Sequence, residues 1–91
     1  MSNINDFVIE DGVLVEYTGE DTDVVIPDSV TELGDWCFNG CESLESITIP
    51  DSVTSLGDDC FAGCDDLTIY AEEGSAAAEY AKKNGIKLEL I

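Results

Sequence analysis

The strongest constraint on this chain is a stretch of sequence that occurs twice. Residues Ile26–Leu44 read IPDSVTELGDWCFNGCESL, and residues Ile49–Leu67 read IPDSVTSLGDDCFAGCDDL. The matching residues Phe38 and Phe61 lie 23 positions apart and are expected to fill the same core position in successive coils. A fixed period of this size is the signature of a stacked-repeat fold, in which each repeat forms one coil and neighbouring coils share a core. The repeat therefore outranks any local propensity in predicting the fold.

Short strands are predicted around and within the repeat. Residues Phe7–Tyr17 alternate on either side of Asp11-Gly12, which predicts a β-hairpin because both central residues of the favoured tight turn need a positive φ. Strands are also predicted at Val24–Ile26, Leu44–Ile49, Thr68–Ala71 and Ile86–Ile91, and a short extended or turning segment is predicted at Val53–Leu56. The strand at Thr68–Ala71 is expected to take the place that Ile47–Pro50 holds one coil earlier.

One helix is predicted near the C-terminal end. Ser75 is a suitable N-cap, the alanine-rich stretch after it favours a helix, and Asn84-Gly85 is a stop signal. On this helix Glu79 and Lys83 are expected to form an i,i+4 ion pair.

The length of 91 residues predicts a single domain. Residues 7–23 would form an N-terminal hairpin cap, residues 24–70 two repeats, and residues 71–91 a C-terminal cap. The segment Met1–Asp6 is polar and is expected to be loose.

The charge of the chain disfavours two classes of partner. There are 21 acidic residues against 3 basic ones, with no His, for a formal net charge of -18. All of the acids except Glu89 precede residue 82, whereas the three lysines fall within Lys82–Lys87. Nucleic-acid binding and adsorption to an anionic membrane both depend on Lys and Arg, so we expect neither. A basic protein partner is favoured instead.

Targeting signals are not evident in the sequence. No stretch approaches the ~20 apolar residues of a membrane span, so membrane insertion is not expected. The N-terminal residues MSNINDFVIEDG lack the basic leader and the apolar run of a signal peptide. If Met1 is the native start, the chain is expected to stay in the cytoplasm. The sequence leaves the oligomeric state open.

The repeat resembles the BspA-like leucine-rich repeats of bacterial proteins. That family's pattern, C-x-x-L-x-x-I-x-I-P-x-S-V-x-x-I-G-x-x-A-F-x-x-C, is matched from Cys41 to Cys64 by CESLESITIPDSVTSLGDDCFAGC. The hairpin before Pro27 and the stretch GSAAAEYAKKNGIKL are similar to the units that often open and end such arrays. The main departure is at Cys37 and Cys60, where the family usually has Ala.

The resemblance implies an α/β fold. It would be a short right-handed leucine-rich-repeat solenoid of parallel strands, with an N-terminal β-hairpin cap and a C-terminal helix–strand cap. The resemblance also implies protein binding or cell-surface adhesion, although members that act in adhesion usually carry long arrays and export signals.

Three interpretations of the four cysteines remain open. Cys37-x-x-x-Cys41 and Cys60-x-x-x-Cys64 could supply a four-thiolate zinc site, although structural zinc sites usually use C-x-x-C spacing. The four residues could instead be small core residues with free thiols, because Cys is among the most buried residue types. Stacked coils also place equivalent residues about 5 Å apart, which would allow Cys37–Cys60 or Cys41–Cys64 disulfides in an exported protein.

The chain offers little for catalysis. It has no His, no Arg, no G-x-S-x-G elbow and no phosphate loop, so we expect neither an enzyme nor a cofactor. Carboxylates recur in phase with the repeat as Asp28/Asp51, Asp35/Asp58 and Glu42/Asp65. Like charges that face each other are destabilising, so salt or divalent cations are expected to raise stability. A calcium site is the alternative interpretation, but no D-x-D-x-D-G loop occurs.

Trp36 is the candidate interaction residue. It occupies the same repeat position as Asp59, and an unpaired Asp would not be buried there, so the position is expected to be exposed. An exposed Trp is typical of an interface anchor. The alternative is that its ring folds against the N-terminal hairpin.

These observations favour a non-enzymatic protein–protein interaction module that presents a parallel-strand face and an acidic rim. Two alternatives remain. One is a structural cap or spacer of a repeat array with no ligand of its own. The other is an acidic decoy, which offers carboxylates to a basic protein in place of nucleic acid.

Overall fold

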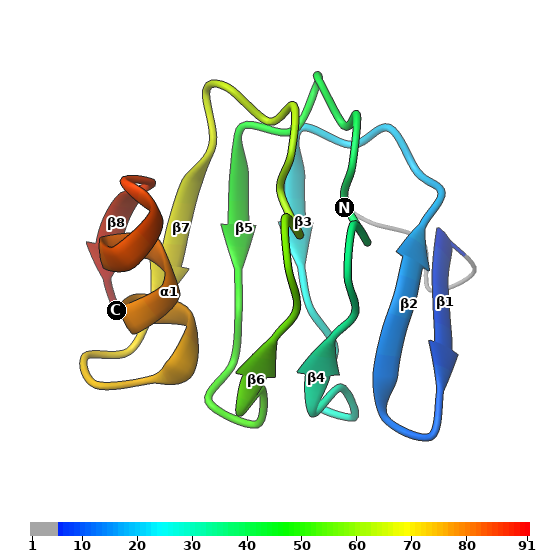
Figure 1. Ribbon diagram of the computed structural model, residues 1–91, viewed down its shortest axis with the longest axis horizontal. Helices are drawn as coiled ribbons and strands as arrows, with labels where there is room; N and C mark the ends of the chain where they lie inside the picture. Colours follow the sequence, from blue (N-terminus) through cyan, green and yellow to red (C-terminus); the bar gives the residue numbers. More distant parts are fainter. Residues whose placement is uncertain (1–5) are drawn as a thin grey trace.

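The coils follow one another from an N-terminal hairpin to a C-terminal helix and strand (Figure 1). A computed structural model of the chain describes residues 6–91, so the expectation of a loose segment over residues 1–5 lies outside the described residues. The elements are β1 (Phe7–Glu10), β2 (Val13–Tyr17), β3 (Asp23–Val25), β4 (Glu32–Leu33), β5 (Ser46–Thr48), β6 (Ser55–Leu56), β7 (Thr68–Ala71), α1 (Ala76–Asn84) and β8 (Lys87–Leu90). No helix within this part of the chain has the length and apolarity that a membrane crossing requires.

The strands form two four-stranded sheets. Sheet A has the order β1-β2-β4-β6, and sheet B has the order β3-β5-β7-β8. Equivalent strands of successive coils pair in parallel, so that Leu33 lies beside Leu56 in sheet A and Val24 lies beside Ile47 in sheet B. The side chains of Val24, Leu33 and Ile47 are buried, and Leu56 packs against them from the end of sheet A. The predicted coil-on-coil stacking of strands is confirmed.

The pairing of β5 with β7 corrects one expectation. The structure places Ile69 beside Ile47, whereas the expected correspondence of Thr68–Ala71 with Ile47–Pro50 puts Thr68 there. Thr68 lies instead beside Ser46. Side chains alternate along a strand, so a shift of one residue would turn Ile69 out of the core. In the observed register Ile69 is fully buried.

A column of aromatic rings joins the coils. Neighbouring ring centroids are 5.3 Å apart for Phe7–Tyr17, 5.1 Å for Tyr17–Phe38, 5.4 Å for Phe38–Phe61 and 6.0 Å for Phe61–Tyr80. The two repeats supply the rings of Phe38 and Phe61. The non-repeated ends of the chain supply the other three rings. Such ring pairs add roughly 0.5–1.5 kcal/mol each beyond the burial of their area. The column therefore ties both ends of the molecule to the repeats.

The N-terminal hairpin forms as predicted. Strands β1 and β2 pair antiparallel, and Asp11 and Gly12 have φ angles of 51° and 82°. The handedness of the stack and the division into caps and repeats (7–23, 24–70 and 71–91) stay predictions.

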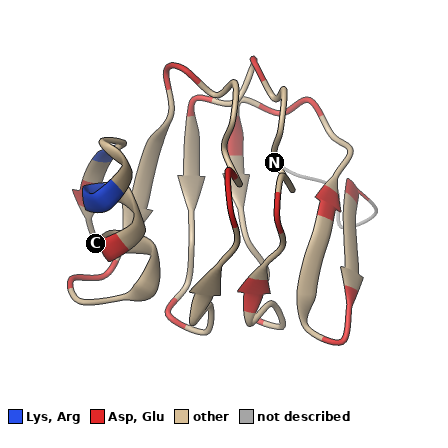
Figure 2. Cartoon of the chain, viewed as in Figure 1, with Lys and Arg blue, Asp and Glu red and all other residues tan. Residues whose placement is uncertain are grey.

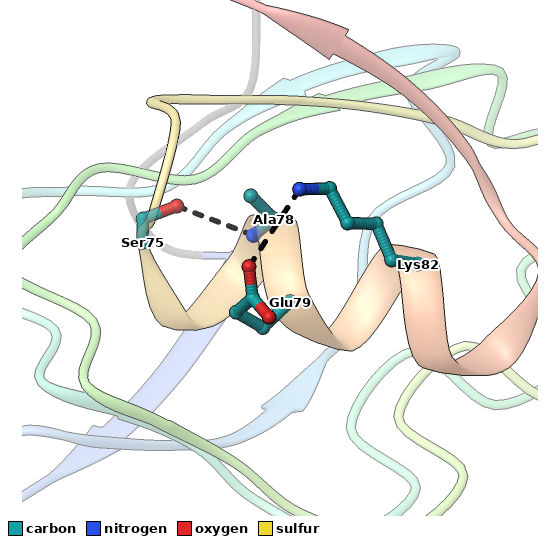
Figure 3. A network of polar contacts seen from close by, with 4 residues as sticks. All are labelled: Ser75, Ala78, Glu79 and Lys82. Carbon is teal, nitrogen blue, oxygen red and sulfur yellow. Dashed lines mark hydrogen bonds and ion pairs between the residues drawn. The ribbon is translucent and has the colours of Figure 1, made fainter.

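The helix also begins where the sequence indicated, but its ion pair differs. The Ser75 hydroxyl accepts a hydrogen bond from the N–H of Ala78 at 3.2 Å, as an N-cap should (Figure 3). The expected partner of Glu79 was Lys83, whereas the structure pairs Glu79 with Lys82 at 3.7 Å. Residues three and four positions apart lie on the same helix face, so either lysine can reach the carboxylate.

The central position of Phe38 in the column predicts a large loss of stability on truncation. Phe38→Ala removes a fully buried ring that contacts rings on both sides, so we expect the free energy of unfolding to fall by about 3–5 kcal/mol. Urea unfolding followed by circular dichroism measures this change. Val25→Ala is the control, because Val25 is exposed and its truncation should change stability by less than about 0.5 kcal/mol. Equal losses in the two variants would contradict the role of the column.

Candidate functional site

Trp36 lies in the turn between β4 and β5, and 53% of its surface is exposed. Its backbone N–H donates to the carbonyl of Asp58 in the next coil at 3.1 Å, and its own carbonyl accepts from Asn39 at 3.0 Å. The backbone of Trp36 is therefore held by the coil stack while the indole ring projects outward. Of the two expectations for this ring, the structure shows the exposed one.

The backbone at Trp36 is left-handed, which the sequence did not reveal. Trp36 has a φ of 61°, and Asp59, at the same repeat position, has a φ of 52°. Asp tolerates this region, but for a bulky side chain a positive φ is a genuine outlier. Such strain costs on the order of 1–3 kcal/mol, and Asp59 shows that the fold accepts a smaller residue with the same backbone conformation. Packing alone gives no reason for a Trp at this position.

Carboxylates lie next to Trp36 along the chain and at the equivalent positions of the next coil. Asp35 precedes Trp36, and Asp58 and Asp59 are the corresponding residues one coil later. The Asp35 side chain accepts a hydrogen bond from the backbone N–H of Asp58 at 2.7 Å, so it also links the two coils. All three acidic residues are exposed. We call Trp36 and these three acidic residues the Trp36 corner.

Acidic residues cover the corners of the coils, and the basic residues gather at the helix end (Figure 2). The other in-phase pairs, Asp28/Asp51 and Glu42/Asp65, are exposed as well. Within residues 6–91 the only ion pair joins Lys82 to Glu79. Most of the negative charge is therefore not neutralised by the protein itself.

The structure does not assemble the candidate metal ligands. In the part of the chain that the structure describes, no group of three or more Cys, Asp or Glu side chains is arranged to hold a metal ion. This geometry favours neither the zinc interpretation of the cysteines nor the calcium interpretation of the carboxylates.

The four cysteines lie in the core or at its border as free thiols. Cys37, Cys60 and Cys64 are buried, and Cys41 is half-buried. The thiol of Cys60 donates to the carbonyl of Gly57 at 3.0 Å. A hydrogen bond with Cys60, together with burial, raises the pKa of the Cys37 thiol. Burial also raises the pKa of Cys41 and of Cys64. This arrangement fits the interpretation of the cysteines as small core residues.

The outer face of sheet B is a second accessible surface. Its exposed or half-buried residues stand in two rows across the strands, Asp23–Ser46–Thr68–Lys87 and Val25–Thr48–Tyr70–Glu89. The Ser46 hydroxyl donates to the Asp23 carboxylate at 2.5 Å, and Val25 is 64% exposed. The sequence predicted a parallel-strand face, and alternation from the buried Ile47 would have identified these residues.

The recesses of the surface are shallow and carry no catalytic pair. One of them has a volume of about 550 Å³ and lies between residues Cys64–Thr68 and Gly85–Lys87. Its ionisable side chains are Cys64, Asp65, Asp66 and Lys87. The chain has no His to act as a general base near neutral pH.

Burial of the Cys64 thiol predicts a loss of stability in alkali. Its pKa rises from an ordinary 9.0 to about 11, so the folded state keeps a proton that the unfolded state releases. The contribution of Cys64 to the free energy of unfolding should be fully present below pH 9 and should be lost as the pH rises toward 11. Urea midpoints measured across this range in reducing buffer should show the fall, and Cys64→Ala should reduce its slope. Superimposable pH profiles for the two proteins would show that Cys64 has no part in it.

The in-phase carboxylates predict that salt stabilises the fold. Raising NaCl from about 0.05 M to about 0.5 M shortens the screening length below ~10 Å, so repulsion across neighbouring coils should weaken. We expect the thermal midpoint to rise by several degrees, with a smaller rise in the variant Glu42→Gln. Because residues 6–91 assemble no group of side chains that could hold a metal ion, CaCl₂ at matched ionic strength should act no more strongly than NaCl. A thermal midpoint that changes with neither NaCl nor CaCl₂ would contradict this prediction.

Comparison with known proteins agrees with the repeat architecture. The sequence matches the family described as BspA type Leucine rich repeat region (6 copies) over residues 3–78. Among solved structures, the chain is similar to the Leucine Rich Repeat protein of T. pallidum, with a TM-score of 0.68 and 26% identity. That similarity covers 77% of this chain and 42% of the other, so this chain spans less than half of its relative. A search of curated proteins gave no match. Because the family match extends over most of its length, the chain belongs to the BspA-type leucine-rich repeat family.

Proposed function

We propose that this chain is a non-enzymatic protein-binding module whose anchor is Trp36. One observation carries the proposal: a Trp that is 53% exposed is held at a left-handed backbone position where packing does not require it. Leucine-rich repeat families generally serve protein interaction, which supports the same class of function. The absence of His and Arg from the sequence supports a role without catalysis.

The chemistry of the Trp36 corner favours a basic segment as the partner. Lys or Arg side chains bind over the face of an indole, and the interaction strengthens as they lose water. The carboxylates of Asp35, Asp58 and Asp59 would pair with neighbouring cations of the same segment. The net charge of -18 would also speed the encounter with a positively charged protein.

The outer face of sheet B could enlarge the contact. Its two rows offer hydroxyl groups, the ring of Tyr70 and the exposed side chain of Val25. A partner that reached both the Trp36 corner and this face would bury more area than either surface offers alone. Interfaces of stable complexes bury about 800 Å² on each partner, which is more than one exposed ring provides.

Binding should depend on Trp36 more than on total charge. Proteins captured by the immobilised wild-type chain are identified and their affinities measured for Trp36→Ala and for Val8→Ala, the control, which truncates an exposed side chain on β1 outside both surfaces. We expect Trp36→Ala to weaken binding by roughly tenfold or more, because interface Trp residues commonly contribute about 2 kcal/mol. Trp36→Asp copies the residue of the second repeat and tests the loss of the ring at a position where Asp is tolerated.

Other outcomes identify the alternative functions. Binding that falls steeply with salt and ignores both Trp36 variants would indicate the acidic decoy. A complete lack of captured protein would indicate a structural cap or spacer. Either result would reject the Trp36-anchored module.

A further inference from the structure

Strand β8 closes sheet B with an edge that no described residue pairs with (Figure 1). The N–H of Ile91 donates to the carbonyl of Ala71 on β7 at 3.1 Å. Polar backbone groups of successive strand residues point to opposite sides, so those of Leu88 and Leu90 point away from β7. Native sheets usually blunt such an edge with charged side chains, proline, a bulge or a covering segment. Strand β8 contains no proline, and its two charged residues, Lys87 and Glu89, are of opposite sign.

We propose that this edge binds the same edge of a second copy of the chain. The two β8 strands would run antiparallel about a two-fold axis at Leu88. In an antiparallel pair, residues whose backbone groups point toward the partner lie opposite one another. This condition allows three registers that keep most of the strand paired, centred on Lys87, on Leu88 or on Glu89.

Charge selects one of the three registers. Centring on Lys87 places two lysines directly opposite each other, and centring on Glu89 does the same with two carboxylates. Both arrangements are destabilising. Centring on Leu88 places Lys87 of each copy opposite Glu89 of the other, which forms two pairs of opposite charge. The sequence Lys87-Leu88-Glu89 is therefore self-complementary in this register alone.

The apolar side of the strand favours the same register. The inward row of sheet B runs through Val24, Ile47, Ile69 and Leu88. The first three side chains are buried, Leu88 is half-buried, and Leu90 is 53% exposed. In the dimer Leu88 would meet Leu88 of the second copy, and Leu90 would meet its Ile86. The apolar row would then continue across the axis and remove this surface from water.

The β8 end is also where a second copy meets the least repulsion. Two chains of charge -18 repel each other over most of their surfaces. All three lysines lie within Lys82–Lys87, beside or on β8 (Figure 2). Of the other strands at the ends of the two sheets, β1 and β3 carry the carboxylates of Glu10 and Asp23, and β6 lies against α1. Pairing through β8 places the acidic bodies at opposite ends of the dimer.

The geometry also sets the size and strength of the assembly. A two-fold contact uses the same surface on both copies, so growth stops at the dimer. One strand from each copy is less than a standard interface, so we expect a dissociation constant in roughly the micromolar to sub-millimolar range. The contact does not use Trp36, and it is independent of the proposed function.

Sedimentation equilibrium of the full chain, from about 10 μM to about 1 mM in reducing buffer with about 0.15 M salt, tests the dimer. We expect a monomer–dimer equilibrium without larger species. Lys87→Glu and Glu89→Lys each place like charges opposite one another and should weaken the dimer roughly tenfold or more. Lys83→Glu is the matched control for Lys87→Glu, since it makes the same change in net charge outside the strand.

Restoring the complementarity should restore the dimer. The double variant Lys87→Glu/Glu89→Lys exchanges the two charges and should dimerise as the wild type does. An equal mixture of the two single variants should form a heterodimer, which also shows that both remain folded. A wild-type chain that stays monomeric throughout would overturn the proposal, as would single variants that dimerise normally or a double variant that does not recover. Species larger than dimers would instead indicate head-to-tail growth of β8 onto β3.

Discussion

The coils of this molecule stabilise one another, because no single coil encloses a core of its own. Phe38 illustrates the dependence: its ring is fully buried only because Tyr17 lies on one side and Phe61 on the other. The backbone follows the same rule, since Phe38 N–H donates to Cys60 and Gly40 N–H donates to Ala62 in the next coil. A stack of this kind needs ends that are not repeats. Here the rings of Phe7 and Tyr80, from the two ends of the chain, pack at the two ends of the aromatic column.

The 23-residue period that aligns the core side chains also aligns exposed side chains that do not contribute to the core. Each coil adds carboxylates above those of its neighbour, and the side chain of Asp35 offsets part of that repulsion by accepting the N–H of Asp58. The position of Trp36 and Asp59 is set by backbone hydrogen bonds rather than by packing, so its side chain can differ between repeats. The two copies therefore differ at a position on the exposed surface.

Much of the fold could be predicted from the sequence, because repeat spacing, the Asp11-Gly12 turn and the Ser75 cap are local signals with direct physical causes. The register of β7 could not, because the chain shortens by one residue after Leu67 and burial of Ile69 decides the pairing. The choice of Lys82 as the partner of Glu79 depends on side-chain geometry that spacing leaves open. The exposure of Trp36 followed from its match with Asp59, whereas its left-handed backbone depends on the turn around it.

The shortened spacing before β7 has a consequence for how such an array can lengthen. Up to Leu67 the coils are interchangeable, since each strand meets its equivalent at the full repeat distance. A duplicated unit inserted there would keep every side chain on its own face. An insertion of the same length after Leu67 would meet a strand in a different register, with Ile69 beside Ile47. Gene duplication in this family member can therefore extend the interior of the array while the terminal strand and helix are carried along unchanged.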